Sequence, residues 1–384
     1  MRVGPLLVAT TTLIAISCSG SSGPAGGASP SGIASGTPAV SPMPVTPGSS
    51  YGLYLVGTRL DMIAVNGQVG ASAPVAAPSV RRCSVALGAV LQPPVSASST
   101  KVYFRDGDTR IRSLTLPTVG SPRLGQTEDV TTVPGGPSKV SFFSVSPDDK
   151  RIAVLVEDMS PDTGINILLY VEDLRGRGNH VNIYSTSTPK NSGTTLWPMG
   201  WNRGHLVLAV MPACTHPSGA VFMSPREWHV SSATTGVRLA TINSRNACIL
   251  SFWPSPAGVA CVNGTTAYLY DWTGKVTGTV PAGSEDLHSG RSPSGRSIFF
   301  SNKAGIGALP SDLLPHDGYE ASRAVSVGNV ELPIPGNIAC LWIDEDHLLG
   351  TQQIFGFPSG QQAELAGEPT IPSGVCVGRF PGGL

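Results

Sequence analysis

The chain of 384 residues lacks several features that usually indicate a function. It has no excess of charge, with 25 basic and 25 acidic residues, and only 13% of its residues are charged. Without a basic excess it has little with which to neutralise phosphates, so we expect no nucleic acid as a partner. After the first residues, no apolar run is long enough to form a transmembrane helix.

Catalytic and metal-binding motifs are also missing. There is no GxSxG elbow, the seven His residues are scattered without an HxxxH or HxH pair, and no two Cys residues have CxxC spacing. Two acidic clusters, residues 105–108 and 344–346, are typical of solvated hairpin turns rather than of a calcium loop. We therefore predict no catalytic residue, no cofactor and no metal site.

The first residues are expected to form an export signal. Arg2 precedes a weakly apolar stretch from Val3 to Ile16, which predicts a signal peptide over residues 1–17. The following Cys18 ends the stretch IAISC, which resembles the lipobox of bacterial lipoproteins, although Ala15 stands where that family most often has Leu. The resemblance implies cleavage before Cys18 and lipid attachment to its sulfur. An ordinary secretory signal with an unrelated Cys is the alternative.

A flexible tether is expected next. From Ser19 to Ser50 the chain is almost entirely Ser, Gly, Pro, Ala and Thr, without charge or aromatic residues, so it cannot bury a core. We divide the chain into a lipoprotein signal peptide (1–17), a lipidated Cys with a disordered tether (18–50) and a folded domain (51–384). This layout predicts a protein anchored by lipid at the outer face of the bacterial cytoplasmic membrane, in the cell envelope.

What the chain has in abundance is turn residues, with 46 Gly and 34 Pro between short apolar runs. One stretch, SPDDKRIAVLV (Ser146–Val156), is a polar turn followed directly by an apolar run. Related stretches begin at Ser96, Trp201, Ser255, Ser292 and Trp342, and the apolar runs follow one another at intervals of 39 to 54 residues. A period of this length predicts the blades of a β-propeller, with the apolar run as the second, fully buried strand of each blade.

A second motif recurs downstream of the first. Short runs joined by a Thr-Gly or Ser-Gly turn are expected to form the hairpin between the third and fourth strands of a blade. The copies span residues 268–276, 228–239 and 354–361. Strand candidates at Tyr51–Val56 and Met62–Val65 are expected to pair with the run 375–380 from the other end of the chain. Such pairing closes the ring and removes an exposed sheet edge.

With these two motifs, residues 51–380 resemble the TolB-like, WD40-like (PD40-repeat) propellers of bacteria, whose repeat carries a Ser-Pro-Asp-Gly-Lys core before an apolar strand. The resemblance implies an all-β fold, for which we predict seven four-stranded blades, with six or eight as alternatives. The motif is best preserved at Ser146–Val156 and Ser292–Ser301. Because this fold hosts many activities, the resemblance indicates architecture more than function.

Six cysteines remain when Cys18 is set aside. An even number is expected for a protein that forms disulfides in an oxidising compartment. Our best single pair is Cys214–Cys248, because Cys214 is expected to end the second strand of one blade and Cys248 to begin the next blade on the same face. The remaining candidates are Cys83, Cys261, Cys340 and Cys376.

The function that these observations favour is a membrane-anchored binding scaffold without catalysis. Its partner is an unknown protein, peptide or glycan, and we expect a monomer. The alternative is an exported propeller enzyme, active on carbohydrates or peptides, with catalytic residues in the central channel. The six Trp residues are expected to pack between blades, and an aromatic ligand-binding face is the second interpretation.

Overall fold

The structure is a computed structural model. It describes residues 50–384 apart from 81, 117–124, 177, 216–223, 244–247, 285, 287, 305–318, 327–330, 334–338, 351–352 and 366–373. These residues belong to one compact unit, residues 40–384, and no helix among them is long and apolar enough to cross a bilayer. The predicted signal peptide, Cys18 and the tether up to residue 49 lie outside the described residues.

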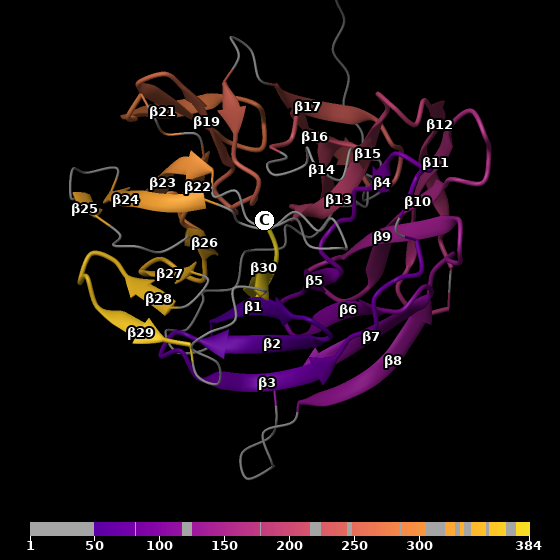
Figure 1. Cartoon of the computed structure of the whole chain (residues 1–384), viewed down its shortest axis with the longest axis horizontal. Coiled ribbons are helices and arrows are strands. Elements are labelled where there is room, and N and C mark those ends of the chain that lie inside the picture. The colour runs from indigo at the N-terminus through magenta and orange to yellow at the C-terminus, as the bar shows by residue number, and fades with distance from the viewer. Residues whose placement is uncertain are drawn as a thin grey trace, which may run out of the picture. The chain divides into compact units, whose positions relative to one another are not determined.

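The described elements are strands, and seven four-stranded antiparallel sheets form the blades of a β-propeller (Figure 1). The prediction of seven blades is therefore confirmed. We number the blades from the first complete one along the chain and give the strands of each blade from the channel outwards.

The first four blades are continuous in sequence apart from one inserted strand. Blade 1 contains β5 (Val95–Ala97), β6 (Val102–Asp106), β7 (Arg110–Thr115) and β8 (Gln126–Thr132); blade 2 contains β9 (Lys139–Val145), β10 (Arg151–Asp158), β11 (Ile165–Asp173) and β12 (Val181–Thr188); blade 3 contains β13 (Thr194–Asn202), β14 (His205–Pro212), β16 (Glu227–Ser232) and β17 (Arg238–Asn243); blade 4 contains β18 (Ile249–Leu250), β19 (Val259–Asn263), β20 (Thr266–Tyr270) and β21 (Val276–Pro281).

The last three blades complete the ring. Blade 5 contains β22 (His288–Arg291), β23 (Ser297–Ala304), β24 (Tyr319–Ser326) and β25 (Glu331–Pro333); blade 6 contains β26 (Ala339–Trp342), β27 (His347–Gly350), β28 (Gln353–Gly356) and β29 (Gln362–Glu364); blade 7 contains β30 (Gly374–Phe380), β1 (Tyr51–Val56), β2 (Arg59–Ala64) and β3 (Val69–Pro74); a separate pair joins β4 (Gly88–Ala89) to β15 (Cys214–Thr215).

Blade 7 closes the ring with strands from both ends of the domain. β30 pairs antiparallel with β1, with Tyr51 opposite Phe380 and Val56 opposite Gly374. This confirms the closure expected from the sequence. It also explains why blade 7 has no copy of the repeated turn: the position of that turn, between its first and second strands, falls between the two ends of the domain.

The ring has two unlike faces, which we name by their connections. The turn face carries the short connections from the first to the second strand and from the third to the fourth strand of each blade. The loop face carries the remaining connections, including the long stretch between β3 and β5 and the one between β14 and β16. All first strands run from the loop face to the turn face, so a residue's place along its strand shows which face it is near.

The repeated turn has the same hydrogen bonds in its two best copies. The Ser146 amide donates to Arg151 O (2.9 Å), and the Asp149 amide donates to Ser146 O (3.0 Å). In blade 5 the Ser292 amide donates to Ser297 O (2.8 Å), and the Gly295 amide donates to Ser292 O (2.9 Å). Asp149 (φ 59°) and Gly295 (φ 78°) have the left-handed conformation that this corner requires.

The strands that follow these turns are buried on both faces, as the sequence predicts. In β10 the six residues from Ile152 to Glu157 are all buried. They separate two hydrophobic clusters, because Ala153 and Leu155 pack towards blade 3 while Ile152 and Val154 pack towards blade 1. The core of the protein therefore lies between the blades, repeated around the ring.

Candidate functional site

The central channel is lined mainly by the first strands of the blades and the turns that follow them. It holds a cavity of about 100 Å³, smaller than the roughly 300 Å³ at which ligand pockets usually begin. Its apolar lining includes Val95, Phe143, Met199, Trp253 and Leu341. Trp253 packs both against the cluster of blades 2 to 4 and against that of blades 6 and 7. The polar residues of the lining are Gln92, Ser96, Ser144, Ser255, Arg291 and Arg379.

Residues 75–94, which we call the strap, connect blade 7 to blade 1 along the loop face, and Gln92 and Pro93 of the strap line the cavity. Residues 88–94 of the strap are all buried. The Gln92 side-chain amide donates to Pro198 O of β13 (2.8 Å), and the Val90 amide donates to Ala213 O (3.1 Å). The strap thus leaves blade 7, reaches blade 3 and returns to begin blade 1.

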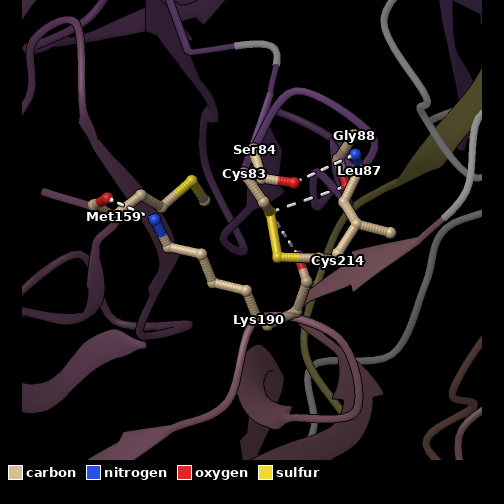
Figure 2. Close-up of a disulfide and its surroundings, with 8 residues drawn as sticks. Cys83, Ser84, Leu87, Gly88, Met159, Lys190 and Cys214 are labelled. Carbon is tan, nitrogen blue, oxygen red and sulfur yellow. Dashed lines mark hydrogen bonds between the residues drawn. A yellow bond between two sulfur atoms is a disulfide. The ribbon is translucent and has the colours of Figure 1, made fainter. Parts of the chain in front are cut away.

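A disulfide between Cys83 and Cys214 holds the strap on blade 3 (Figure 2). Their Cα atoms lie 6.1 Å apart, and next to them β4 pairs with β15. The predicted pair Cys214–Cys248 is therefore wrong. Cys214 does lie just after the second strand of its blade, at the loop face. Its partner, however, is Cys83 of the strap. The strap is not part of the repeated blade unit, so the repeat could not predict this pair.

The other two disulfides join neighbouring strands near the loop face. Cys248 precedes β18 and bonds to Cys261 in β19, with a Cα separation of 5.4 Å. Cys340 of β26 bonds to Cys376 of β30, with a Cα separation of 5.9 Å, and so ties blade 6 to the strand that closes the ring. All six candidate cysteines are therefore disulfide-bonded. Three disulfides are typical of proteins from oxidising, extracytoplasmic compartments.

The acidic turn at Asp106–Asp108 also holds the strap. The Asp106 carboxylate accepts from the Ala76 amide (2.8 Å), and the Asp108 carboxylate accepts from the amide (2.5 Å) and the hydroxyl (2.6 Å) of Ser79. The sequence correctly predicted a hairpin turn here, between β6 and β7. It did not show that both carboxylates bind another part of the chain.

Glu157 is a carboxyl group with no obvious structural role. It is fully buried in β10, at the interface of blades 2 and 3, and neither of its oxygens has a hydrogen-bond partner among the described residues. Burial raises the pKa of Glu157 to about 8, and the neighbouring Thr195 hydroxyl offsets only part of that rise. The signal in the sequence is one acidic residue at the end of the apolar run IAVLV.

Arg105 is a second buried ionisable group, on the opposite side of blade 2. Its guanidinium donates to Ser141 O and lies 6.0 Å from the centre of the Phe142 ring. Burial lowers the pKa of Arg105 to about 10, so the group remains charged at neutral pH. Arg105 and Glu157 are on separate blade interfaces and do not form an acid–base pair.

On the turn face, carboxylates of the repeated turns bind the preceding blade. Asp149 accepts from the Thr100 hydroxyl (2.5 Å) and the Tyr103 hydroxyl (2.8 Å) of blade 1. Glu345 of blade 6 accepts from the amide (2.5 Å) and the hydroxyl (2.6 Å) of Ser294 in blade 5. Burial and the bond to Asp149 raise the pKa of Tyr103 well above its usual value. The acidic turn residues therefore link blades.

The Trp residues lie mainly between blades. Trp201 and Trp342 occupy equivalent positions at the ends of β13 and β26, and each indole N–H donates to the first strand of the preceding blade, to Ser144 O (3.2 Å) and Gly290 O (2.8 Å). Trp197, Trp228 and Trp272 are also buried. Packing between blades is confirmed for these five, and an aromatic ligand-binding face is not formed by them.

The described residues bring few chemical groups together. Among them no group of three His, Cys, Asp or Glu side chains could hold a metal ion. Within the same residues, the lining of the cavity contains no Asp, Glu or His side chain. Its charged side chains are those of Arg291 and Arg379.

Comparison with known proteins adds little about activity. No protein-family model matches the sequence, and no curated protein matches it. Among solved structures, an oligogalacturonate lyase in complex with manganese is 10% identical with a TM-score of 0.45, covering 82% of this chain and 89% of that chain. The β-propeller domain of Cps50 (Swd1) from Myceliophteria thermophila is 12% identical with a TM-score of 0.32, covering 71% and 95%.

A third solved structure is a protein of unknown function from Bacteroides caccae, which is 11% identical with a TM-score of 0.36, covering 74% of this chain and 94% of that chain. At such low similarity these structures transfer no substrate or partner to this chain. The assignment of a seven-bladed propeller rests on the seven sheets themselves.

Proposed function

We propose that this protein is an exported, lipid-anchored binding scaffold of the bacterial cell envelope. The observation that carries the proposal is the lining of the channel. Its cavity is small, at about 100 Å³, and the described lining contains no Asp, Glu or His side chain to act as a general acid or base. Binding then belongs to the surfaces of the ring, where loops on a rigid frame are free to contact a partner.

The loop face is the surface that we assign to a protein partner. The middle of the strap makes a turn there, where Val85 is 96% exposed while Cys83, two residues away, is fixed to blade 3. A large aliphatic side chain held rigidly in water loses little conformational entropy when a partner covers it. The resemblance of the repeated turn to TolB-like propellers supports a partner within the envelope.

The anchor is tested by changing Cys18→Ala. We expect the unchanged protein to partition with the membrane fraction and the variant to appear in the soluble exported fraction, because the acyl chains are lost. Ser19→Ala is the matched control and should remain with the membrane. Retention of the Cys18→Ala protein in the membrane would disprove lipid anchoring at this position.

The binding role is tested by a photo-crosslinking amino acid at one of two exposed positions in intact cells. Introduced at Val85, on the loop face, it should give a discrete adduct with one protein partner. Introduced at Lys150, on the turn face, it should not give that adduct. Absence of a discrete adduct at Val85 would contradict a loop-face partner. Sedimentation of the purified domain checks the expected monomer.

A further inference from the structure

The turn-face end of the channel is occupied by the segment Pro381–Leu384, which follows β30. Figure 1 shows this end of the chain at the centre of the ring. The Gly382 amide donates to Ser98 O of blade 1 (2.8 Å), and the Leu384 amide donates to Trp201 O of blade 3 (3.0 Å). The segment therefore leaves blade 7 and lies across blades 1 to 3, which follow it in the ring.

Two positions of this segment fit only glycine. A Cβ at position 382 would overlap the carbonyl of Ala97. Gly383 has φ +104°, and a Cβ there would lie 3.3 Å from the Pro147 ring of the repeated turn in blade 2. A side chain is strained in that backbone conformation. The channel mouth thus selects against side chains at both positions.

The third position has a slot for an aliphatic side chain. Leu384 lies over Gly200 of β13, where a Cβ would be only 2.6 Å from Leu384 Cδ1. The Leu384 side chain packs against the cluster that contains Trp201. The absence of a side chain at Gly200 therefore forms the slot that receives Leu384.

Arg379 supplies the remaining polar contact. Its guanidinium donates to Gly383 O (3.2 Å). Burial lowers the pKa of Arg379 to about 10, and the carboxylates of Glu345 and Asp344 oppose that effect, so the group is charged at neutral pH. A charged guanidinium in this position needs an acceptor, and the segment provides it as a backbone carbonyl.

We propose that the channel mouth on the turn face is a peptide-binding site, which residues 382–384 occupy in cis. Its partner is a segment of another protein with two glycines followed by an aliphatic residue, bound in the same conformation as residues 382–384. That segment donates backbone amides to Ser98 O and Trp201 O, offers a carbonyl to Arg379 and inserts its aliphatic side chain over Gly200. The inference rests on the proposed binding role and assigns a second surface to it.

The segment is well suited to exchange with such a partner. It is held by two backbone hydrogen bonds, one arginine contact and one side chain, and its residues are only half-buried. Because it is joined to β30, its effective concentration at the site is on the order of millimolar. A free peptide therefore competes poorly unless the segment is weakened or the peptide is presented at a similarly high local concentration.

The test uses a labelled peptide, acetyl-Phe-Pro-Gly-Gly-Leu-amide, and fluorescence anisotropy. The Leu384→Asp protein, whose segment no longer fits the slot, should bind it saturably. The unchanged protein should bind at least about tenfold more weakly, because its own segment competes. Adding Gly200→Val to Leu384→Asp should abolish binding by filling the slot. A peptide with two alanines in place of the glycines should not bind.

Several results would overturn the proposal. The first is that a Leu384→Asp protein with an unchanged thermal transition does not bind the peptide saturably. The second is that this variant binds the alanine peptide as tightly as the glycine peptide. The third is that the unchanged protein binds the glycine peptide as tightly as the variant does. Hydrogen exchange provides a second measurement on the unchanged protein, in which the Leu384 amide should exchange faster than the Val154 amide of β10. Equal protection of the two would show a fixed structural segment. The crosslink at Val85 tests the loop-face role separately.

Discussion

The two faces of the ring are held together by different means. On the turn face, short turns of neighbouring blades bind each other through hydrogen bonds such as those of Asp149 and Glu345. Near the loop face lie all three disulfides, and the strap crosses from blade 7 to blade 3. Repeated hydrogen bonds between turns thus hold one face, and covalent links, one of them between residues 131 positions apart, hold the other.

This difference implies that the turn face is rigid and that the residues of the loop face can vary. A repeated turn fixes the distance between neighbouring blades in the same way at several positions, so it leaves little freedom for new loops. A disulfide fixes one point and leaves the residues around it free to differ. We therefore expect the loop face to carry specificity for a protein partner and the turn face to maintain the ring and the channel mouth.

The largest effect is expected from removing the disulfide of the strap. Cys83 and Cys214 are 131 residues apart, and the chain-entropy model gives such a link a contribution of about 5 kcal/mol. For Cys248 and Cys261, 13 residues apart, it gives about 3 kcal/mol. We expect the paired Cys→Ala variants to lose stability in this order, measured by denaturant unfolding. The opposite order would show that strap closure contributes little.

Next in size is the pH dependence that arises from Glu157. Its folded pKa of about 8 exceeds its unfolded value of about 4.3, so the folded state binds the proton more tightly. Stability from this group is complete below about pH 4 and is lost as pH rises to about 8, with a slope of up to about 1.4 kcal/mol per pH unit.

The substitution Glu157→Gln should remove that slope and leave the variant more stable than the unchanged protein at pH 8, as measured by thermal unfolding across pH 5 to 8. The neighbouring Asp158 has a lowered pKa because of its bonds to Ser160 and Lys139. Asp158→Asn should therefore leave the slope over this pH range unchanged. A slope that survives Glu157→Gln would place the titrating group elsewhere.

A smaller effect is expected from a single link on the turn face. At position 149, Asn tolerates the left-handed backbone conformation. It lacks the charged carboxylate of Asp149, whose two oxygens accept from the Thr100 and Tyr103 hydroxyls. Asp149→Asn should cost about 1 to 2 kcal/mol of unfolding free energy, as for other hydrogen bonds to charged groups. If the cost matched that of losing the strap disulfide, the two faces would not differ as we describe.

The smallest effect is expected at Glu128, on the outer strand β8. It forms ion pairs with Lys101 (3.3 Å) and Arg175 (2.9 Å), which lower its pKa, but all three side chains are accessible to solvent. Exposed pairs of this kind contribute little because water and salt screen them. Glu128→Gln should leave the unfolding midpoint unchanged within error. A clear shift would mean that surface charge also holds the turn face.

The sequence predicted the part of the fold that repeats. Ser146–Val156 and its relatives located the second strand of six blades. Ser, Pro and Gly favour a turn through their own local geometry and hydrogen bonds, so the same sequence pattern recurs in each copy. The apolar runs at the two ends predicted the closing pair of β1 and β30. The assignment of Asp148–Lys150 to turn geometry was correct for the turn but missed the link from Asp149 to blade 1.

The parts that could not be predicted occur once and depend on distant residues. The partner of Cys214 lies in the strap, 131 residues earlier, and no local pattern indicates that path. Gly382 and Gly383 have the composition of an ordinary loop, and only the structure shows how closely they lie against Ala97 and Pro147. Glu157 was visible as an acidic residue beside an apolar run, but its burial follows from the packing of blade 3 against blade 2.

The most direct test of the account is hydrogen exchange of the folded protein before and after reduction of its disulfides. The Val90 amide reports on the strap, and the Ser146 and Ser292 amides report on the repeated turns. We predict that reduction accelerates exchange at Val90 by about tenfold or more, because the strap opens locally. Exchange at Ser146 and Ser292 should stay nearly constant. Equal acceleration at all three amides would contradict the claim that the two faces are held by separate means.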